Sequence, residues 1–118
     1  MELTFEIAEQ WIGDVPVVTV SGEIDVATAP QLRQHLEASP VAEAPTVVVD
    51  LTGVSFLDST ALGVLVGAHR RRGEVGGDLR LVVTEPRILK VFEITDLIRV
   101  FRIVGTVDEA LQPIGPPL

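Results

Sequence analysis

Residues 46–63 read T-V-V-V-D-L-T-G-V-S-F-L-D-S-T-A-L-G, and they carry the strongest signals for the fold class. Its first part, Thr46–Leu51, is a short apolar run without the alternation of a strand that has one wet face. Such a run is typical of a central strand covered on both faces. A helix is then predicted to begin near Asp58 or Ser59 and to extend to about Arg72. A buried strand that leads into a helix predicts a layered α/β fold, in which helices connect parallel strands.

The residues before this stretch predict a hairpin. Apolar and polar residues alternate over residues 3–7, and the β-branched run Val15–Val20 follows a Gly-Asp turn. We expect the two segments to pair as antiparallel strands, and the second strand to end at Ser21 and Gly22.

A helix is predicted next, with a start signal and a buried stripe. Thr28 suits the N-cap, and Gln31 three residues later completes a capping box. Leu32 and Leu36 supply the buried stripe before the helix ends ahead of Pro40.

Four further elements follow the helix that starts near residue 58. They are a strand at Leu79–Val83, a helix from Pro86, a short edge strand at Val100–Ile103, and a last short helix between Thr106 and Pro113 with a capping box of Thr106 and Glu109. The order β-β-α-β-α-β-α-(β)-α predicts the α/β class, with a mixed sheet of four to five strands and about four helices. We expect a single domain over residues 1–118, with its core in residues 3–111 and a frayed tail at 112–118.

The composition disfavours several classes of function. With 9 basic and 17 acidic residues, the chain has a formal net charge of −8, which disfavours nucleic acid as a partner. It has no cysteine and two histidines, so we expect neither thiol chemistry nor a metal site. None of the ten glycines falls in a phosphate-binding pattern, and we expect no cofactor. No apolar run is long enough to enter and span a membrane, and no signal peptide opens the chain, so we expect a cytoplasmic protein.

The histidines and the cluster of arginines are expected to have structural roles. Ser59 and His69 lie ten residues apart on one predicted helix, which separates their Cα atoms by about 15 Å. That separation is too long for a nucleophile and its base, and we expect no catalytic residues. His35 is expected on a solvated or partly covered helix face. Arg70–Arg72 precede a glycine-rich turn and are expected to form the solvated end of a helix.

The densest polar cluster in this apolar stretch is Asp58, Ser59 and Thr60, at the predicted start of the helix. A helix N-terminus offers unsatisfied backbone N–H groups and the positive end of the macrodipole, which favour an anion. One interpretation of the cluster is plain N-capping by Asp58 or Ser59. The other is a regulatory phosphoacceptor, whose phosphate the helix end would tolerate.

The same helix carries a bare face, because Ser59, Gly63 and Gly67 recur at i, i+4 and i+8. Each interior glycine destabilises a helix by about 1 kcal/mol relative to alanine. We therefore expect that some contact requires these two positions to have no side chain. One interpretation is close packing of this face against the sheet or a neighbouring helix. The other is a flat docking platform that begins at Ser59.

A second acidic segment, G-E-I-D at residues 22–25, closes the second predicted strand. It is interpreted either as a simple turn signal or as a functional segment. In the second case the sheet places Asp25 beside Asp58, and the two carboxylates make an acidic pocket around the Ser59 hydroxyl.

Four motifs together carry a family resemblance: G-E-I-D at residues 22–25, V-V-V-D-L at 47–51, F-L-D-S-T-A-L-G at 56–63 and G-D-L-R-L at 77–81. In these motifs, and over roughly residues 3–111, the chain resembles the bacterial anti-sigma factor antagonists of the STAS domain family. The resemblance implies that Ser59 is phosphorylated by an anti-sigma factor with a serine kinase fold, and that a serine phosphatase reverses the modification. It also implies that Asp25 and Asp58 are acidic neighbours of the acceptor.

The resemblance implies a non-enzymatic switch in transcription regulation. The unphosphorylated form binds the anti-sigma factor and frees the sigma factor, and phosphate on Ser59 ends the binding. The expected partner-binding residues are Asp25, Asp58, Ser59, Thr60, Gly63 and Gly67. The alternative is a stand-alone accessory subunit of a membrane lipid-transport ATPase, or a signalling scaffold.

Overall fold

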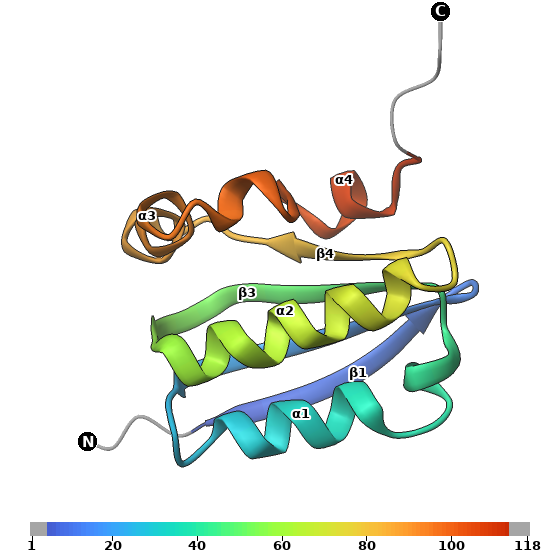
Figure 1. The fold of residues 1–118 in the computed structure, drawn as a ribbon, viewed down its shortest axis with the longest axis horizontal. Helices are drawn as coiled ribbons and strands as arrows, with labels where there is room; N and C mark the ends of the chain where they lie inside the picture. The colour runs from blue at the N-terminus through green and yellow to red at the C-terminus, as the bar shows by residue number, and fades with distance from the viewer. Residues whose placement is uncertain (1–4, 114–118) are drawn as a thin grey trace, which may run out of the picture.

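A central parallel strand organises the structure, which is a computed structural model and describes residues 5–113. The strands form one five-stranded sheet in the order β1-β2-β3-β4-β5. Figure 1 labels β1, β3 and β4 of this sheet. They are β1 (Glu6–Ile12), β2 (Val15–Ile24), β3 (Thr46–Leu57), β4 (Asp78–Val82) and β5 (Arg102–Val104). The helices are α1 (Ala29–Glu37), α2 (Ser59–Gly73), α3 (Pro86–Ile94) and α4 (Val107–Leu111), with 3-10 turns η1 (Val41–Glu43) and η2 (Leu97–Arg99). The predicted α/β class and mixed sheet are confirmed.

The β3 strand lies at the centre of the sheet, as its uninterrupted apolar run predicts. β1 pairs with β2 antiparallel, and the other three pairings are parallel. Val47 and Val49 pack in the core cluster that contains Leu32, while Val48 packs in a second cluster with Ala110 of α4. Burial on both faces removes the need for alternation, because each consecutive side chain finds an apolar neighbour.

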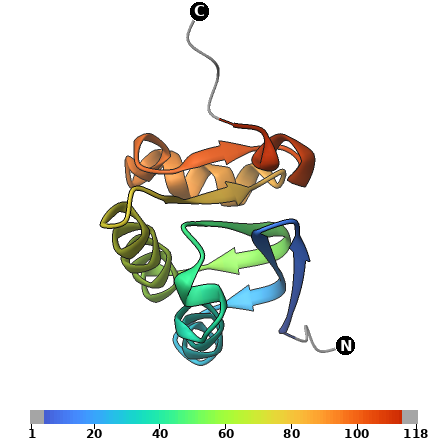
Figure 2. The same ribbon diagram turned by 90° about the vertical axis from the view of Figure 1, so that its right-hand side faces the viewer.

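The two faces of the sheet are covered unequally. Residues of α1, α2 and α3 pack against one face in the larger cluster, including Leu36, Leu65 and Phe92. On the other face, α4 supplies Ala110 against Val48 and Val82. The views in Figures 1 and 2 show α1 and α2 side by side on the same layer. Within residues 5–113, no helix has the length and apolar character needed to cross a membrane.

The predicted end of β2 at Ser21 and Gly22 is wrong. The strand continues to Ile24, because β3 also runs on to Leu57 and offers a parallel partner for these extra residues. The extension is irregular, because the register between β2 and β3 shifts twice. Gly22 has a φ of 92°, a conformation that residues with a side chain rarely adopt. As a result, β2 and β3 end at the same edge of the sheet, where Ile24 pairs with Leu57.

The predicted capping box at the start of α1 is also wrong. Thr28 occupies the N-cap position, yet its side chain makes no cap hydrogen bond. Its hydroxyl accepts from the Asp25 N–H at 2.9 Å and donates to the Glu23 carbonyl at 2.8 Å, so it ties together the preceding turn. At α4 the predicted capping by Thr106 is confirmed, since its hydroxyl accepts from the Glu109 N–H at 3.1 Å.

The prediction of a solvated arginine cluster is wrong for Arg72, which is 2% exposed. Its guanidinium donates to three backbone carbonyl oxygens, those of Ala68 at 3.0 Å, Val41 at 3.1 Å and Leu36 at 3.3 Å. Burial, with a smaller contribution from the neighbouring Arg71, lowers the pKa of the Arg72 guanidinium. The residue therefore joins the end of α2 to the end of α1 and to η1.

The predictions for the two ends of the chain can be compared with the structure only over residues 5–113. Phe5 and Ile7 pack against the core, as the alternation predicts, and Glu6 is exposed. The predicted position of Leu3 and the fraying of residues 114–118 lie outside the described residues.

Candidate functional site

The candidate site lies where the parallel strands β2 and β3 end. Ile24 pairs with Leu57 in the last step of the register, and the Asp58 N–H donates to the Ile24 carbonyl at 3.2 Å. The turn that follows β2 is thereby fixed to the first residues of α2. Two segments more than thirty residues apart in the sequence, residues 22–25 and 58–60, become neighbours at one edge of the sheet.

Asp58 is the N-cap of α2. Its Oδ1 accepts from the Thr60 N–H at 2.9 Å and from the Ala61 N–H at 3.1 Å, and its backbone is extended. Two of the N–H groups that a helix start leaves without a partner are thus satisfied by one carboxylate oxygen. The interpretation as a plain N-cap is therefore correct for Asp58, and the cap holds the next two residues in place.

Ser59 differs from both of its neighbours. It is the first residue of α2, it is exposed, and no hydrogen bond within residues 5–113 involves its hydroxyl. Thr60 is only half-exposed. The 15-residue helix directs the positive end of its dipole towards this position, which stabilises negative charge there. Of the two hydroxyls, that of Ser59 is the more accessible to a second protein.

Asp25 lies in the turn after β2, and its carboxylate is bound within that turn. Its Oδ1 accepts from the Ala27 N–H at 2.9 Å and from the Thr28 N–H at 3.1 Å. The turn-signal interpretation of G-E-I-D therefore accounts for its geometry. Over the described part of the chain, no hydrogen bond joins Asp25 to Ser59, and the acidic pocket of Asp25 and Asp58 around the hydroxyl stays a prediction.

The glycines of α2 are not required by packing against the sheet. A methyl group added at Gly63 would meet no neighbouring atom within 4 Å, and one added at Gly67 would lie 3.5 Å from Nη1 of Arg71, an ordinary contact. Gly63 is exposed and Gly67 is half-exposed. Close packing therefore does not explain either glycine. Ser59, Gly63 and Gly67 form a surface without large side chains, which we call the bare strip.

Two exposed apolar side chains at this edge were not predicted as site residues. Val26, directly after Asp25, is 72% exposed, and Phe56, directly before Leu57, is 48% exposed. Apolar and aromatic groups are enriched at the centres of protein interfaces. The signal for Phe56 was present in the sequence, because the buried Leu57 directs its predecessor to the opposite face of the strand. The signal for Val26 was absent, since a turn residue has no periodicity.

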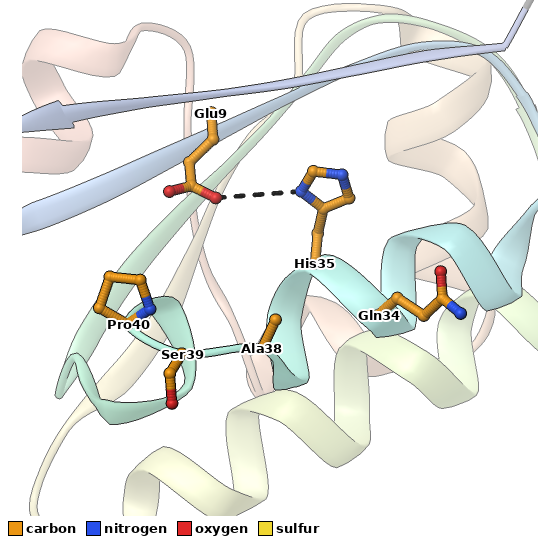
Figure 3. A pocket seen from close by; sticks show the side chains of 6 residues that line it. All are labelled: Glu9, Gln34, His35, Ala38, Ser39 and Pro40. Carbon is orange, nitrogen blue, oxygen red and sulfur yellow. Dashed lines mark ion pairs between the residues drawn. The ribbon is translucent and has the colours of Figure 1, made fainter.

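A separate hollow of about 310 Å³ lies between β1 and the end of α1 (Figure 3). Nδ1 of His35 is 3.9 Å from Oε1 of Glu9, and the other oxygen of Glu9 accepts from Nε1 of Trp11 at 2.8 Å. His35 is partly covered, as its helical position predicts. Residues 5–113 contain no cluster of three or more histidine, aspartate or glutamate side chains placed to bind a metal ion.

Comparisons with known proteins match most of the chain. The model of the family described as STAS domain matches residues 6–110. An anti-sigma-B factor antagonist of Listeria monocytogenes is 39% identical over 97 residues, which are 82% of this chain and 84% of that protein. The crystal structure of an anti-sigma factor antagonist from Mycobacterium paratuberculosis superposes with a TM-score of 0.84 at 32% identity, over 92% of each chain. The Bacillus cell fate determinant SpoIIAA in its phosphorylated form superposes with a TM-score of 0.68 at 25% identity, over 92% of this chain and 96% of its own.

Proposed function

The chain belongs to the STAS domain family, and from that premise we propose that it is an anti-sigma factor antagonist controlled by phosphorylation of Ser59. The unphosphorylated protein binds an anti-sigma factor with a serine kinase fold, and the sigma factor is released. Phosphorylation by that partner ends the binding, and a serine phosphatase restores it. One observation carries the proposal: the Ser59 hydroxyl is exposed at the first residue of α2, where the bare strip begins, and it makes no hydrogen bond to any of residues 5–113. The relatives named as anti-sigma factor antagonists support it.

The start of α2 is suited to carry a phosphate without unfolding. A negative group within the first turn of a helix is stabilised by about 0.3–2 kcal/mol. The Asp58 cap is formed by backbone N–H groups of Thr60 and Ala61, and it does not use the Ser59 hydroxyl. Phosphorylation therefore leaves the cap and the fold intact and changes only the surface.

That change is large for a partner that contacts this edge. A phosphate adds a charge of about −1.5 to −2 beside Asp58, at the sheet edge that also carries the exposed side chains of Val26 and Phe56. A charge that is desolvated in an interface without a partner costs several kcal/mol, and each 1.4 kcal/mol is about tenfold in affinity. Binding is lost while the domain stays folded, which is the requirement for a reversible switch.

The proposed role is binding and not catalysis. His69, on the same helix as Ser59, accepts a hydrogen bond from the Leu79 N–H at its Nδ1, 3.2 Å away, and its ring packs edge-on against Phe101. It therefore has a structural role two to three turns from the hydroxyl. In this proposal Ser59 acts as a substrate of the partner kinase.

The test combines phosphosite mapping with titration calorimetry. The anti-sigma factors with a serine kinase fold from the same organism are purified one at a time and incubated with the protein and ATP. Phosphate is expected on Ser59 of the wild type. In the absence of ATP, Ser59→Ala should bind as the wild type does, and Ser59→Asp should bind at least about tenfold more weakly. Thr60→Ala is the matched control and should retain phosphorylation. Phosphate on Thr60 with Ser59 unmodified, or equal affinity of wild type and Ser59→Asp, would contradict the proposal.

A further inference from the structure

A small charged groove lies between α1 and α2, next to the bare strip. Its lining residues are Arg33 and Glu37 of α1 and Gly63, Val64, Gly67 and Arg71 of α2. Its volume is about 120 Å³. Pockets for small molecules begin at about 300 Å³, so this groove has room for a single side chain and not for a metabolite.

The charges around the groove do not cancel. Nη2 of Arg71 is 3.4 Å from Oε2 of Glu37, and this pair crosses the groove between the two helices. Arg33 is exposed, and among residues 5–113 no acidic group lies within ion-pair distance of it. Two guanidinium groups and one carboxylate therefore leave one positive charge at the groove, on a chain whose formal net charge is −8.

We propose that this groove receives an acidic side chain of the anti-sigma factor, and that Arg33 recognises its carboxylate. The inference rests on the proposed function, because it names the second contact of the same partner. A carboxylate approaching most of this surface is repelled, whereas at the groove it meets the free Arg33 and the partly exposed Arg71. Guanidinium groups bind carboxylates with two parallel hydrogen bonds, which fixes orientation as well as position.

The groove lies next to the bare strip, so an ion pair at Arg33 can orient the partner on that strip. Gly63 and Gly67 line it and belong to the strip that begins at Ser59, so one partner surface can cover the acceptor hydroxyl and the groove together. Figures 1 and 2 show α1 and α2 running side by side, with α3 separated from α1 by α2. A charge pair at one end of a docking strip fixes the register of the partner along it, because opposite charges must meet there and like charges are excluded.

The test uses two charge reversals that change the net charge equally. Arg33→Glu is compared with Arg87→Glu, an exposed residue in the first turn of α3, in titrations with the same purified anti-sigma factor. Both should keep the melting temperature of the wild type within about 2 °C, because both are surface changes. Arg33→Glu should raise Kd at least about tenfold and Arg87→Glu less than about threefold. Arg33→Lys, which keeps the charge, should recover most of the affinity.

A second arm identifies the occupant. Surface aspartates and glutamates of the anti-sigma factor are changed to arginine one at a time, and one such variant should restore binding of Arg33→Glu. Equal affinities of Arg33→Glu and Arg87→Glu, or a complete absence of a restoring variant, overturns this inference alone, provided that the wild type binds and Ser59→Asp does not. If the wild type binds none of the anti-sigma factors, the proposed function fails, and this inference fails with it.

Discussion

At its first residue α2 exposes a hydroxyl that makes no hydrogen bond within the described residues, whereas near its last residue it buries a guanidinium that binds three carbonyl oxygens. The first end is capped by its immediate neighbour Asp58. The second end is fixed by Arg72 to Leu36 near the end of α1 and to Val41 at the start of η1, which lie 36 and 31 residues earlier in the chain. One helix thus has an exposed end at Ser59, the open end, and a buried end at Arg72, the locked end.

The contrast shows how a surface can change its charge without changing its shape. Arg72 fixes α2 relative to α1, and both helices line the groove that holds Arg33. If Ser59 is phosphorylated as proposed, the phosphate is added to a helix that is already held in position at its far end. We therefore expect the binding surface to keep its shape in both states, so that the proposed switch acts through the added charge.

The largest expected effect comes from breaking the locked end. Arg72→Ala removes the partners of three buried carbonyl oxygens and leaves a cavity, which should lower the free energy of unfolding by about 3 kcal/mol or more. Urea unfolding measures the loss directly. Arg72→Met, which fills the volume without donating, should recover part of the stability, and the remaining deficit reports the hydrogen bonds. A loss below about 1 kcal/mol for Arg72→Ala would show that α2 is not locked there.

A smaller effect is expected at the open end. Asp58→Ala removes the acceptor for the N–H groups of Thr60 and Ala61, and N-cap losses cost about 1 kcal/mol. The melting temperature should fall by about 4 °C in calorimetry. Asp58→Asn is the matched control, because asparagine caps a helix as well as aspartate does and removes only the charge. A fall of the same size for both variants would mean that charge, and not the cap, stabilises this end.

The sequence predicts the open end better than the locked one, for a physical reason. The start of α2 depends on local chemistry, since Asp58 caps the N–H groups two and three residues ahead of it. The start of the central strand at Thr46 is predicted equally well, because burial on both faces leaves an uninterrupted apolar run in the sequence; its predicted end at Leu51 is wrong, since β3 continues to Leu57. The predicted starts of these two elements were therefore correct.

Arg72 and Thr28 could not be predicted in this way. The acceptors of Arg72 are carbonyls of α1 and η1, which only the packing of the two helices places beside it. Thr28 fits a capping pattern, but its hydroxyl finds a competing acceptor in the Glu23 carbonyl of the preceding turn. The same limitation applies to the groove, because Arg33 and Arg71 are 38 residues apart in the sequence.

The smallest expected effect tests the strip between the two ends. Gly63→Ala adds a methyl group where no neighbouring atom lies within 4 Å, so it introduces no clash within the protein. Alanine also favours a helix by about 1 kcal/mol over glycine, and the variant should melt a few degrees higher than the wild type.

A partner that packs on the strip would meet the new methyl group, and its affinity should fall while the stability rises. Opposite changes in stability and affinity distinguish a docking surface from a packing surface. If Gly63 were needed for internal packing, Gly63→Ala would lower both the stability and the affinity. Calorimetric melting and titration with the anti-sigma factor measure the two quantities on one sample. A variant that is both more stable and equally well bound would show that the partner leaves Gly63 uncovered.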